Sequence, residues 1–303
     1  MKKKISILIT TKNRLTDLKI TLANLAEFII DSTVECMVYD DASSDGTYSY
    51  VKENFPKIIL LRNEKSLGLI HNRNVLLNNC SGEYAISLDD DAHFITENPL
   101  EIIESYFRKN PVCGVLAFRI FWDTNNPTTT QTNEVAHRVK GFVGCGHAWR
   151  MAAWKAIPDY PEWFVFYGEE EFASYQLFKK AWEVHYVPEV LIHHRVDVKS
   201  RKKNKDYTIR LRRSLRSGWY LYILFYPLQS IPKKLVYSVW MQLKLKVFKG
   251  DLKAGKAMMM AFFDFGYNFL RLLKNRNEFS KNDFDTFFKI ENTKVYWRPK
   301  ENR

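Results

Sequence analysis

The sequence predicts an α/β fold built around a mostly parallel, twisted sheet that is flanked by helices. Over residues 4–88, runs of β-prone apolar residues alternate with segments whose apolar residues recur at helical spacing, and this alternation is typical of parallel sheets. Polar clusters directly follow three of the runs, at the position where such sheets bind ligands. Apolar residues make up 46% of the 303-residue chain and charged residues 26%, which excludes a disordered protein.

The elements of the first third follow from their patterns. A strand that is buried on both faces consists of uninterrupted β-prone residues, whereas a helix repeats its apolar residues every three or four positions. The predicted strands are 4–10, 35–39, 58–62 and 84–88, and the predicted helices are 16–30, 47–54 and 69–79. This rhythm favours parallel strands joined by helical crossovers.

After residue 98 the pattern changes. The sequence predicts helices over 99–109 and 169–180, strands over 114–122 and 183–194, a Gly-rich, strand-like segment over 141–149 and a polar loop over 123–134. The basic segment 199–205 predicts a domain boundary. Beyond it, Arg, Lys and aromatic residues are dense, and one of the expected helices is 257–273. We therefore expect an α/β domain over 1–198 and a helical extension over 199–303.

The charge is unevenly distributed between these two parts. Residues 1–198 contain 21 Lys and Arg against 26 Asp and Glu, a net charge of −5, whereas residues 199–303 contain 25 against 8, a net charge of +17. The longest uncharged run, 217–232, has 16 residues and contains Pro227, so it is shorter than the ~20 residues that span a bilayer. The sequence predicts a mildly acidic domain with a basic, aromatic extension and no membrane-spanning helix.

Two features favour a cytoplasmic protein. The apolar stretch 5–9 is too short for a secretion signal, and no small-residue cleavage site follows it. The four cysteines are widely spaced and show no metal-binding pattern. We therefore expect reduced, mostly buried thiols.

The acidic triplet Asp89, Asp90 and Asp91 is the most informative cluster. Three adjacent carboxylates repel one another unless a cation neutralises them. Hard oxygen ligands suit Mg²⁺ or Mn²⁺, so the triplet predicts a divalent metal site. The alternative is a solvated acidic turn. The clusters 10–14 and 40–45 also follow predicted strands, and three clusters at one sheet edge indicate a binding site better than any single polar turn does.

Several motifs in a fixed order resemble the family 2 glycosyltransferases of GT-A fold. They are ISILITTKNR, DDASSDGT, the pattern N-x4-GL-x3-RN that contains Asn63, Gly68 and Arg73, and GEYAISLDDDA. The segments GFVGCGHAWRMAAW and FYGEEEFASYQLFKKAWEVHYVPEV, with a terminal His, resemble the acceptor-side half of that family. The resemblance covers residues 4 to about 195. It implies a catalytic domain over 1–198, divided into a nucleotide-sugar-binding half over 1–97 and an acceptor-side half over 98–198.

The resemblance also implies roles for individual donor-side residues. Thr10, Lys12 and Arg14 would line the nucleotide pocket, although the family commonly has Tyr at the position of Lys12. Asp41 would accept a hydrogen bond from the nucleobase. Arg73 would lie over the base or reach the diphosphate.

The metal site follows from the same resemblance. Asp89 and Asp91 match the two acidic residues of the family's DxD motif, so Asp89 would face the ribose and Asp91 the Mn²⁺ or Mg²⁺. Asp90 lies between them in sequence and is expected to help bind the donor. His194 would complete the metal coordination, and the alternative for this residue is a structural role. His147 is a weaker candidate for the pocket.

The glutamate run at 169–171 predicts the catalytic base. Inverting transfer needs a base for the acceptor hydroxyl, and family members usually carry Glu-Asp here with the second residue as the base. Glu170 is the expected base, with Glu169 and Glu171 left open as alternatives. The other reading is that these carboxylates only complement a helix dipole. Phe172 and Gln176 depart from the family's usual Asp and Arg, which leaves the acceptor pocket less well defined.

The function predicted from these features is metal-dependent transfer of a sugar from a nucleotide-diphosphate donor to a hydroxyl of a saccharide or lipid-linked acceptor, in cell-surface polysaccharide biosynthesis. The basic, aromatic extension favours peripheral attachment to the inner face of the cell membrane, and the alternative is a helical subdomain that only packs on the catalytic domain. Sugar nucleotidyl transfer and nucleic-acid binding are the two alternative functions. Sugar nucleotidyl transfer would need a Gly-rich phosphate loop, which TTKNRLTD is not. Nucleic-acid binding lacks any recognised motif, so no nucleic-acid partner is expected.

Overall fold

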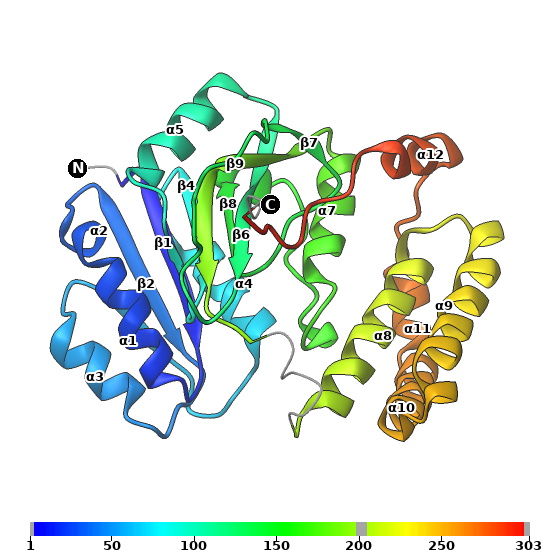
Figure 1. Cartoon of the computed structure of the whole chain (residues 1–303). Coiled ribbons are helices and arrows are strands. Elements are labelled where there is room, and N and C mark those ends of the chain that lie inside the picture. The colour runs from blue at the N-terminus through cyan, green and yellow to red at the C-terminus, as the bar shows by residue number, and fades with distance from the viewer. Residues whose placement is uncertain (1–2, 198–204, 300–303) are drawn as a thin grey trace.

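The computed structural model describes residues 3–197 and 205–299 (Figure 1). Its strands are β1 (Ile5–Thr11), β2 (Val34–Asp40), β3 (Ile59–Arg62), β4 (Tyr84–Asp89), β5 (Ala92–Phe94), β6 (Cys113–Trp122), β7 (His137–Val139), β8 (Gly146–Arg150) and β9 (Glu183–His194). Its helices are α1 (Leu15–Asn24), α2 (Ala26–Ile30), α3 (Thr47–Asn54), α4 (Leu69–Asn79), α5 (Pro99–Lys109), α6 (Met151–Trp154), α7 (Glu169–Lys179), α8 (Tyr207–Phe225), α9 (Ile231–Leu245), α10 (Leu252–Tyr267), α11 (Phe269–Lys274) and α12 (Lys281–Lys289). The predicted boundary 199–205 lies, except for Lys205, outside the described residues.

The predicted α/β fold is confirmed. The strands form one sheet of order β3-β2-β1-β4-β8-β6-β9-β5, and β7 pairs with β9. The pairs β1–β2, β1–β4, β2–β3 and β6–β9 are parallel, whereas β8, β5 and β7 pair antiparallel with their neighbours. Every residue of β1 is buried, which explains its uninterrupted β-prone sequence.

The strand register brings the three predicted polar clusters to one edge of the sheet. Thr11 at the end of β1 lies opposite Asp40 at the end of β2. On the other side of β1, Thr10 lies opposite Asp89 at the end of β4. The carboxyl ends of three neighbouring strands therefore form the floor of one site.

Three predicted elements differ from the structure. The predicted helix 16–30 is two helices, because the chain leaves helical geometry at Leu25. Only the second part of the predicted strand 141–149 is a strand, β8, since residues before Gly146 pack against the site as a loop. The predicted helix 257–273 begins earlier, at Leu252, and is interrupted at Asn268, whose side chain donates a hydrogen bond to the Tyr220 hydroxyl.

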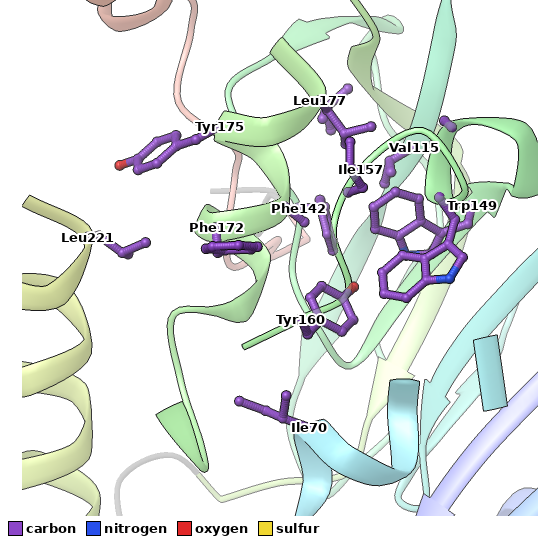
Figure 2. Close-up of a cluster of buried hydrophobic side chains, with 14 of the residues drawn as sticks. Ile70, Val115, Phe142, Trp149, Ile157, Tyr160, Phe172, Tyr175, Leu177 and Leu221 are labelled. Carbon is purple, nitrogen blue, oxygen red and sulfur yellow. The ribbon is translucent and has the colours of Figure 1, made fainter. Parts of the chain in front are cut away.

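The extension packs against the α/β domain through a continuous apolar core. Figure 1 shows α7 between the sheet and α8, with α9 and α10 further out. Figure 2 shows Leu221 of α8 facing Phe172 of α7, while Trp149 and Val115 lie deeper toward the sheet; all four belong to the same buried cluster. α8 is therefore fixed relative to the start of α7.

The end of the described chain also returns to the sheet. Trp297 forms a bridge with Phe121 in β6, and the Trp122 indole donates a hydrogen bond to the Val295 carbonyl. Within the described ranges, no helix is both long enough and apolar enough to cross a membrane.

Candidate active site

A large cavity lies at the carboxyl ends of the strands. Its volume is about 1290 Å³, more than the roughly 300–1,000 Å³ of a typical single-ligand pocket. The lining comes from the strand ends, the loop before β8, the start of α7 and one face of α8, and it includes Thr10, Lys12, Arg14, Asp41, Arg73, Asp89, Asp90, Asp91, Glu169, Glu170, Glu171 and His194. The structure thus brings all the predicted site residues except His147 to one cavity.

Asp89, Asp91 and His194 form a group that could hold a metal ion. One ligand atom from each residue lies within 4.8 Å of the others, and His194 Nε2 is 2.9 Å from an Asp91 oxygen. Although burial opposes ionisation, His194 and Arg14 lower the pKa of Asp91 to about 2. Two carboxylates and an imidazole suit a divalent cation, so these residues fit the predicted metal.

Asp90 contacts Thr11 and shares Arg14 with Asp91. Its carboxylate accepts a hydrogen bond from the Thr11 hydroxyl at 2.9 Å and pairs with Arg14 Nε at 3.3 Å. Arg14 also reaches Asp91, at 2.6 Å. Burial raises the pKa of Asp90 to about 7, against the opposing effect of Arg14. Arg14 therefore links the two carboxylates and neutralises part of their charge.

Asp41 is held by the loop that precedes α4. One carboxylate oxygen accepts from the Leu67 amide at 2.8 Å and the other from the Ser66 hydroxyl at 2.6 Å, while Asn63 donates from the neighbouring strand end. Although burial opposes the shift, these hydrogen bonds lower the pKa of Asp41. The structure thus shows Asp41 shaping this loop, and its contact with a nucleobase stays a prediction.

Arg73 connects the two sides of the cavity. Its guanidinium donates to Asp89 at 2.8 Å, to Glu169 at 3.0 Å and to the Gly144 carbonyl at 2.9 Å. Burial lowers the pKa of Arg73, but the charges of Asp89 and Glu169 outweigh it and raise that pKa. These partners lie 16 and 96 residues away in sequence, which is why sequence reasoning assigned Arg73 to the donor alone.

The three glutamates occupy different environments. Glu169 is almost fully buried against Arg73, whereas the Glu170 side chain is 20% exposed to the cavity. Burial and the charge of Glu169 raise the pKa of Glu170 to about 8, and burial and Glu170 raise that of Glu171 to about 7. A raised pKa near the working pH suits a general base.

Gly144 permits this close packing. A Cβ at this position would lie 2.2 Å from a Glu170 carboxylate oxygen and 2.9 Å from an Arg73 guanidinium nitrogen. No side chain fits there without displacing both groups. Sequence analysis singled out the Gly-rich segment but not this role, because the role depends on α7 and α4.

The loop before α7 has an unusual backbone. Val165, Tyr167 and Gly168 all have positive φ angles, of 67°, 71° and 88°, and for a β-branched residue this region is a clear outlier. Such backbones cluster at functional sites. Here the loop ends at Gly168, the residue before the three glutamates, so it sets their position in the cavity.

The prediction that His147 belongs to the pocket is wrong. It is fully buried, its Nδ1 contacts the Val143 carbonyl at 3.2 Å, and it does not line the cavity. Sequence analysis missed the contribution of α8, since only tertiary packing brings that helix to the cavity.

The chain matches the family model described as glycosyl transferase family 2 over residues 6–168. No curated protein sequence matches it. Among solved structures it is similar to S. aureus TarS, with 19% identity and a TM-score of 0.55 over 73% of this chain and 40% of that one. The chain thus spans well under two thirds of the TarS chain.

Two further structures show the same fold. The mannosyltransferase PcManGT from Pyrobaculum calidifontis, in complex with GDP-Man and Mn²⁺, has 14% identity and a TM-score of 0.57 over 95% of this chain and 79% of that one. GalNAc-T7 with UDP, GalNAc and Mn²⁺ has 15% identity and a TM-score of 0.56 over 74% of this chain and 48% of that one. These proteins share the GT-A fold, and the family model covers more than half of this chain. The chain therefore belongs to glycosyl transferase family 2.

Proposed function

We propose that the protein is an inverting, metal-dependent glycosyltransferase that moves a sugar from a nucleotide-diphosphate donor to a hydroxyl of a saccharide or lipid-linked acceptor, in cell-surface polysaccharide biosynthesis. The observation that carries the proposal is the position of Arg73. One guanidinium contacts both Asp89, among the strand-end carboxylates, and Glu169, beside the candidate base. A donor at the carboxylates and an acceptor at the glutamates would therefore meet within one cavity.

The chemistry follows from the two groups of carboxylates. Glu170 takes the proton of the acceptor hydroxyl as its oxygen attacks the anomeric carbon. The bond to the nucleoside diphosphate breaks on the opposite face of the sugar, which inverts the configuration. Asp89, Asp91 and His194 would hold the Mn²⁺ or Mg²⁺, which as a Lewis acid stabilises the charge of the departing diphosphate. Arg73 orients Asp89 and the glutamates relative to one another.

The remaining donor contacts are proposed from the cavity lining. Thr10 and Lys12 lie at the end of β1, Asp41 follows β2, and Arg14 and Asp90 lie beside the metal ligands. These residues would bind the nucleotide. Family membership favours this transfer over the nucleotidyl-transfer and nucleic-acid-binding alternatives.

Donor turnover tests the proposal. The full chain is incubated with UDP-, GDP- and dTDP-sugars with Mn²⁺ or Mg²⁺, and nucleoside diphosphate release is measured. We expect release from one nucleotide class, and its loss in EDTA. Release of nucleoside monophosphate with pyrophosphate, or specific binding of an oligonucleotide without any turnover, would instead support an alternative function.

Gly144→Ala is predicted to lower turnover on the order of 10²-fold, because small displacements of catalytic groups have effects of that size. The added methyl group pushes away the Glu170 carboxylate and the Arg73 guanidinium. Both are ends of flexible side chains, so the fold should persist. Gly266→Ala is the matched control, since its Cβ has no neighbour within 4 Å. Equal turnover for both variants and wild type would contradict the role of Gly144.

We further propose that the extension attaches the enzyme peripherally to the cytoplasmic face of the cell membrane. Leu252, Met259, Phe263 and Tyr267 lie four or seven residues apart on α10, and their exposed fractions are 81, 54, 73 and 91%. α9 exposes Val236, Tyr237 and Trp240 in the same way. Exposed apolar side chains on this scale mark an interaction surface.

Exposed lysines lie on α9, on α10 and in the segment between these helices. They are Lys233, Lys234, Lys244, Lys249, Lys253 and Lys256. A lysine near an anionic lipid surface contributes about 1 kcal/mol, so basic charge beside apolar side chains favours lipid. Arg212 and Arg216 do not belong to this surface, since both pair with Asp264.

Phe263→Glu with Tyr267→Glu is predicted to abolish most binding to vesicles of phosphatidylglycerol and phosphatidylcholine, measured by co-sedimentation. Ile30→Glu on α2 is the control, because Ile30 is also exposed but lies outside the extension. High salt should release part of the wild-type protein from the vesicles. The Debye length, over which charges attract one another, falls from about 10 Å at 0.1 M salt to about 3 Å at 1 M. If the wild-type protein does not bind these vesicles at low salt, the extension serves only to pack against the catalytic domain.

A further inference from the structure

One face of α8 lines the cavity. Arg210, Arg213, Ser214, Ser217 and Leu221 contribute to it, and their spacing of three and four residues places them on one side of the helix. Other residues of α8, including Trp219 and Leu215, pack against Met258 and Ala261 of α10. The extension thus supplies part of the wall that faces the glutamates.

Close packing fixes this wall relative to the candidate base. Arg216 donates a hydrogen bond to the Phe164 carbonyl, just before the strained loop. A Cβ at Gly168 would lie 2.9 Å from the Ser217 Cβ. The middle of α8 therefore lies directly against the loop that leads into Glu169 and Glu170.

Arg213 differs from the other arginines of α8. Asp206 pairs with Arg210, and Asp264 pairs with both Arg212 and Arg216. No carboxylate among the described residues pairs with Arg213. Burial, Arg216 and Arg212 lower its pKa, so the protein holds a half-buried cation at an electrostatic cost that no carboxylate among the described residues offsets.

Ser217 is a second unpaired group, one helical turn further along. It is 1% exposed, and its hydroxyl has no hydrogen-bond partner in the described parts of the chain. Buried hydroxyls are normally satisfied. A guanidinium and a hydroxyl that both lack partners and line the same cavity indicate a ligand with several acceptor oxygens.

We infer that the acceptor carries a phosphate group, which Arg213 and Ser217 bind on the α8 side of the cavity. This inference rests on the proposed function. Guanidinium and phosphate match in charge and geometry, and the remaining phosphate oxygens accept from the hydroxyl. In the proposed function the donor diphosphate binds at the strand ends, beside Asp89 and Asp91, which form a different part of the cavity lining. Acceptor specificity is therefore supplied by the extension, outside the segment that the family model matches.

The test uses three sugars that differ in one group: glucose 6-phosphate, glucose and glucuronate. Each is titrated calorimetrically into the full chain, whose donor site is filled with its nucleoside diphosphate and Mg²⁺. We expect glucose 6-phosphate to bind more tightly than the other two. Arg213→Gln should weaken its binding on the order of 10- to 100-fold, the usual range for a charged hydrogen bond. Arg212→Gln is the matched control, since Arg212 is adjacent on α8 but does not line the cavity.

Two further measurements separate the outcomes. Because Arg213 has no anionic partner in the described structure, Arg213→Gln should not lower the melting temperature, and nucleoside diphosphate should bind it as it binds wild type. Polyprenyl phosphate in detergent, compared with glucose 6-phosphate, distinguishes a lipid carrier from a soluble saccharide as the source of the phosphate. Equal binding of glucuronate, equal binding by wild type and Arg213→Gln, or a loss of nucleotide affinity in that variant overturns the inference. Failure of nucleoside diphosphate to bind wild type would instead count against the proposed function.

Discussion

We expect Glu170→Gln to lower kcat by ~10²–10⁴-fold, the usual contribution of general-base catalysis, and to leave the affinity for nucleoside diphosphate near that of wild type. Gln keeps the shape of the side chain but cannot take the proton of the acceptor hydroxyl. Nucleoside diphosphate release under saturating donor gives kcat, and calorimetry gives the affinity. The two measurements together separate a catalytic loss from a binding loss.

The pH dependence of turnover provides a second readout of the same residue. Burial and Glu169 raise the pKa of Glu170 to about 8, so the fraction in the base form increases as the pH rises toward that value. Wild-type kcat should increase over this range, and the increase should disappear in Glu170→Gln. If Glu169→Gln or Glu171→Gln shows the large loss and Glu170→Gln does not, the base is assigned to the wrong residue.

Asp91→Ala should abolish donor turnover, with a loss on the order of 10³-fold or more, because metal stabilisation of the leaving group contributes several kcal/mol. Asp91 contacts both His194 at 2.9 Å and Arg14 at 2.6 Å, so its removal also leaves two basic groups without this partner. Circular dichroism and the melting temperature establish that the variant is folded.

Asp31→Ala is the control for this variant, since Asp31 is an exposed carboxylate before β2, at the opposite edge of the sheet. It should retain full turnover. Calorimetric titration of Mn²⁺ should show binding to wild type and to Asp31→Ala, and none to Asp91→Ala. Full activity of Asp91→Ala, or of wild type in EDTA, would refute the metal role.

Local sequence patterns predict much of the fold. The bounds of α3, α4, α5 and β9 coincide with the segments predicted from periodicity, because each segment carries its own apolar repeat. The strands β5 and β7 have three residues each and are held by pairing with β9. Segments that short contain no period to detect, so they were not predicted.

The candidate site likewise contains some residues that local sequence patterns predict and others that they do not. Residues that follow a strand, such as Asp41 and Asp91, were predictable because parallel strands bring their carboxyl ends together. Contacts between segments that are distant in sequence were not predictable. Arg73 reaches Glu169, 96 residues away, Gly144 is defined by its distance to Glu170, and Arg213 reaches the cavity only because α8 packs on α7. None of these relations leaves a local pattern in the sequence.

The configuration of the released sugar tests the account's central claim most directly. With water as the acceptor, the full chain cleaves its nucleotide-sugar donor, and ¹H NMR identifies the first anomer to appear, before mutarotation mixes the two. A single displacement with Glu170 as the base predicts the anomer opposite to that in the donor. Release of the same anomer as in the donor would contradict an inverting mechanism.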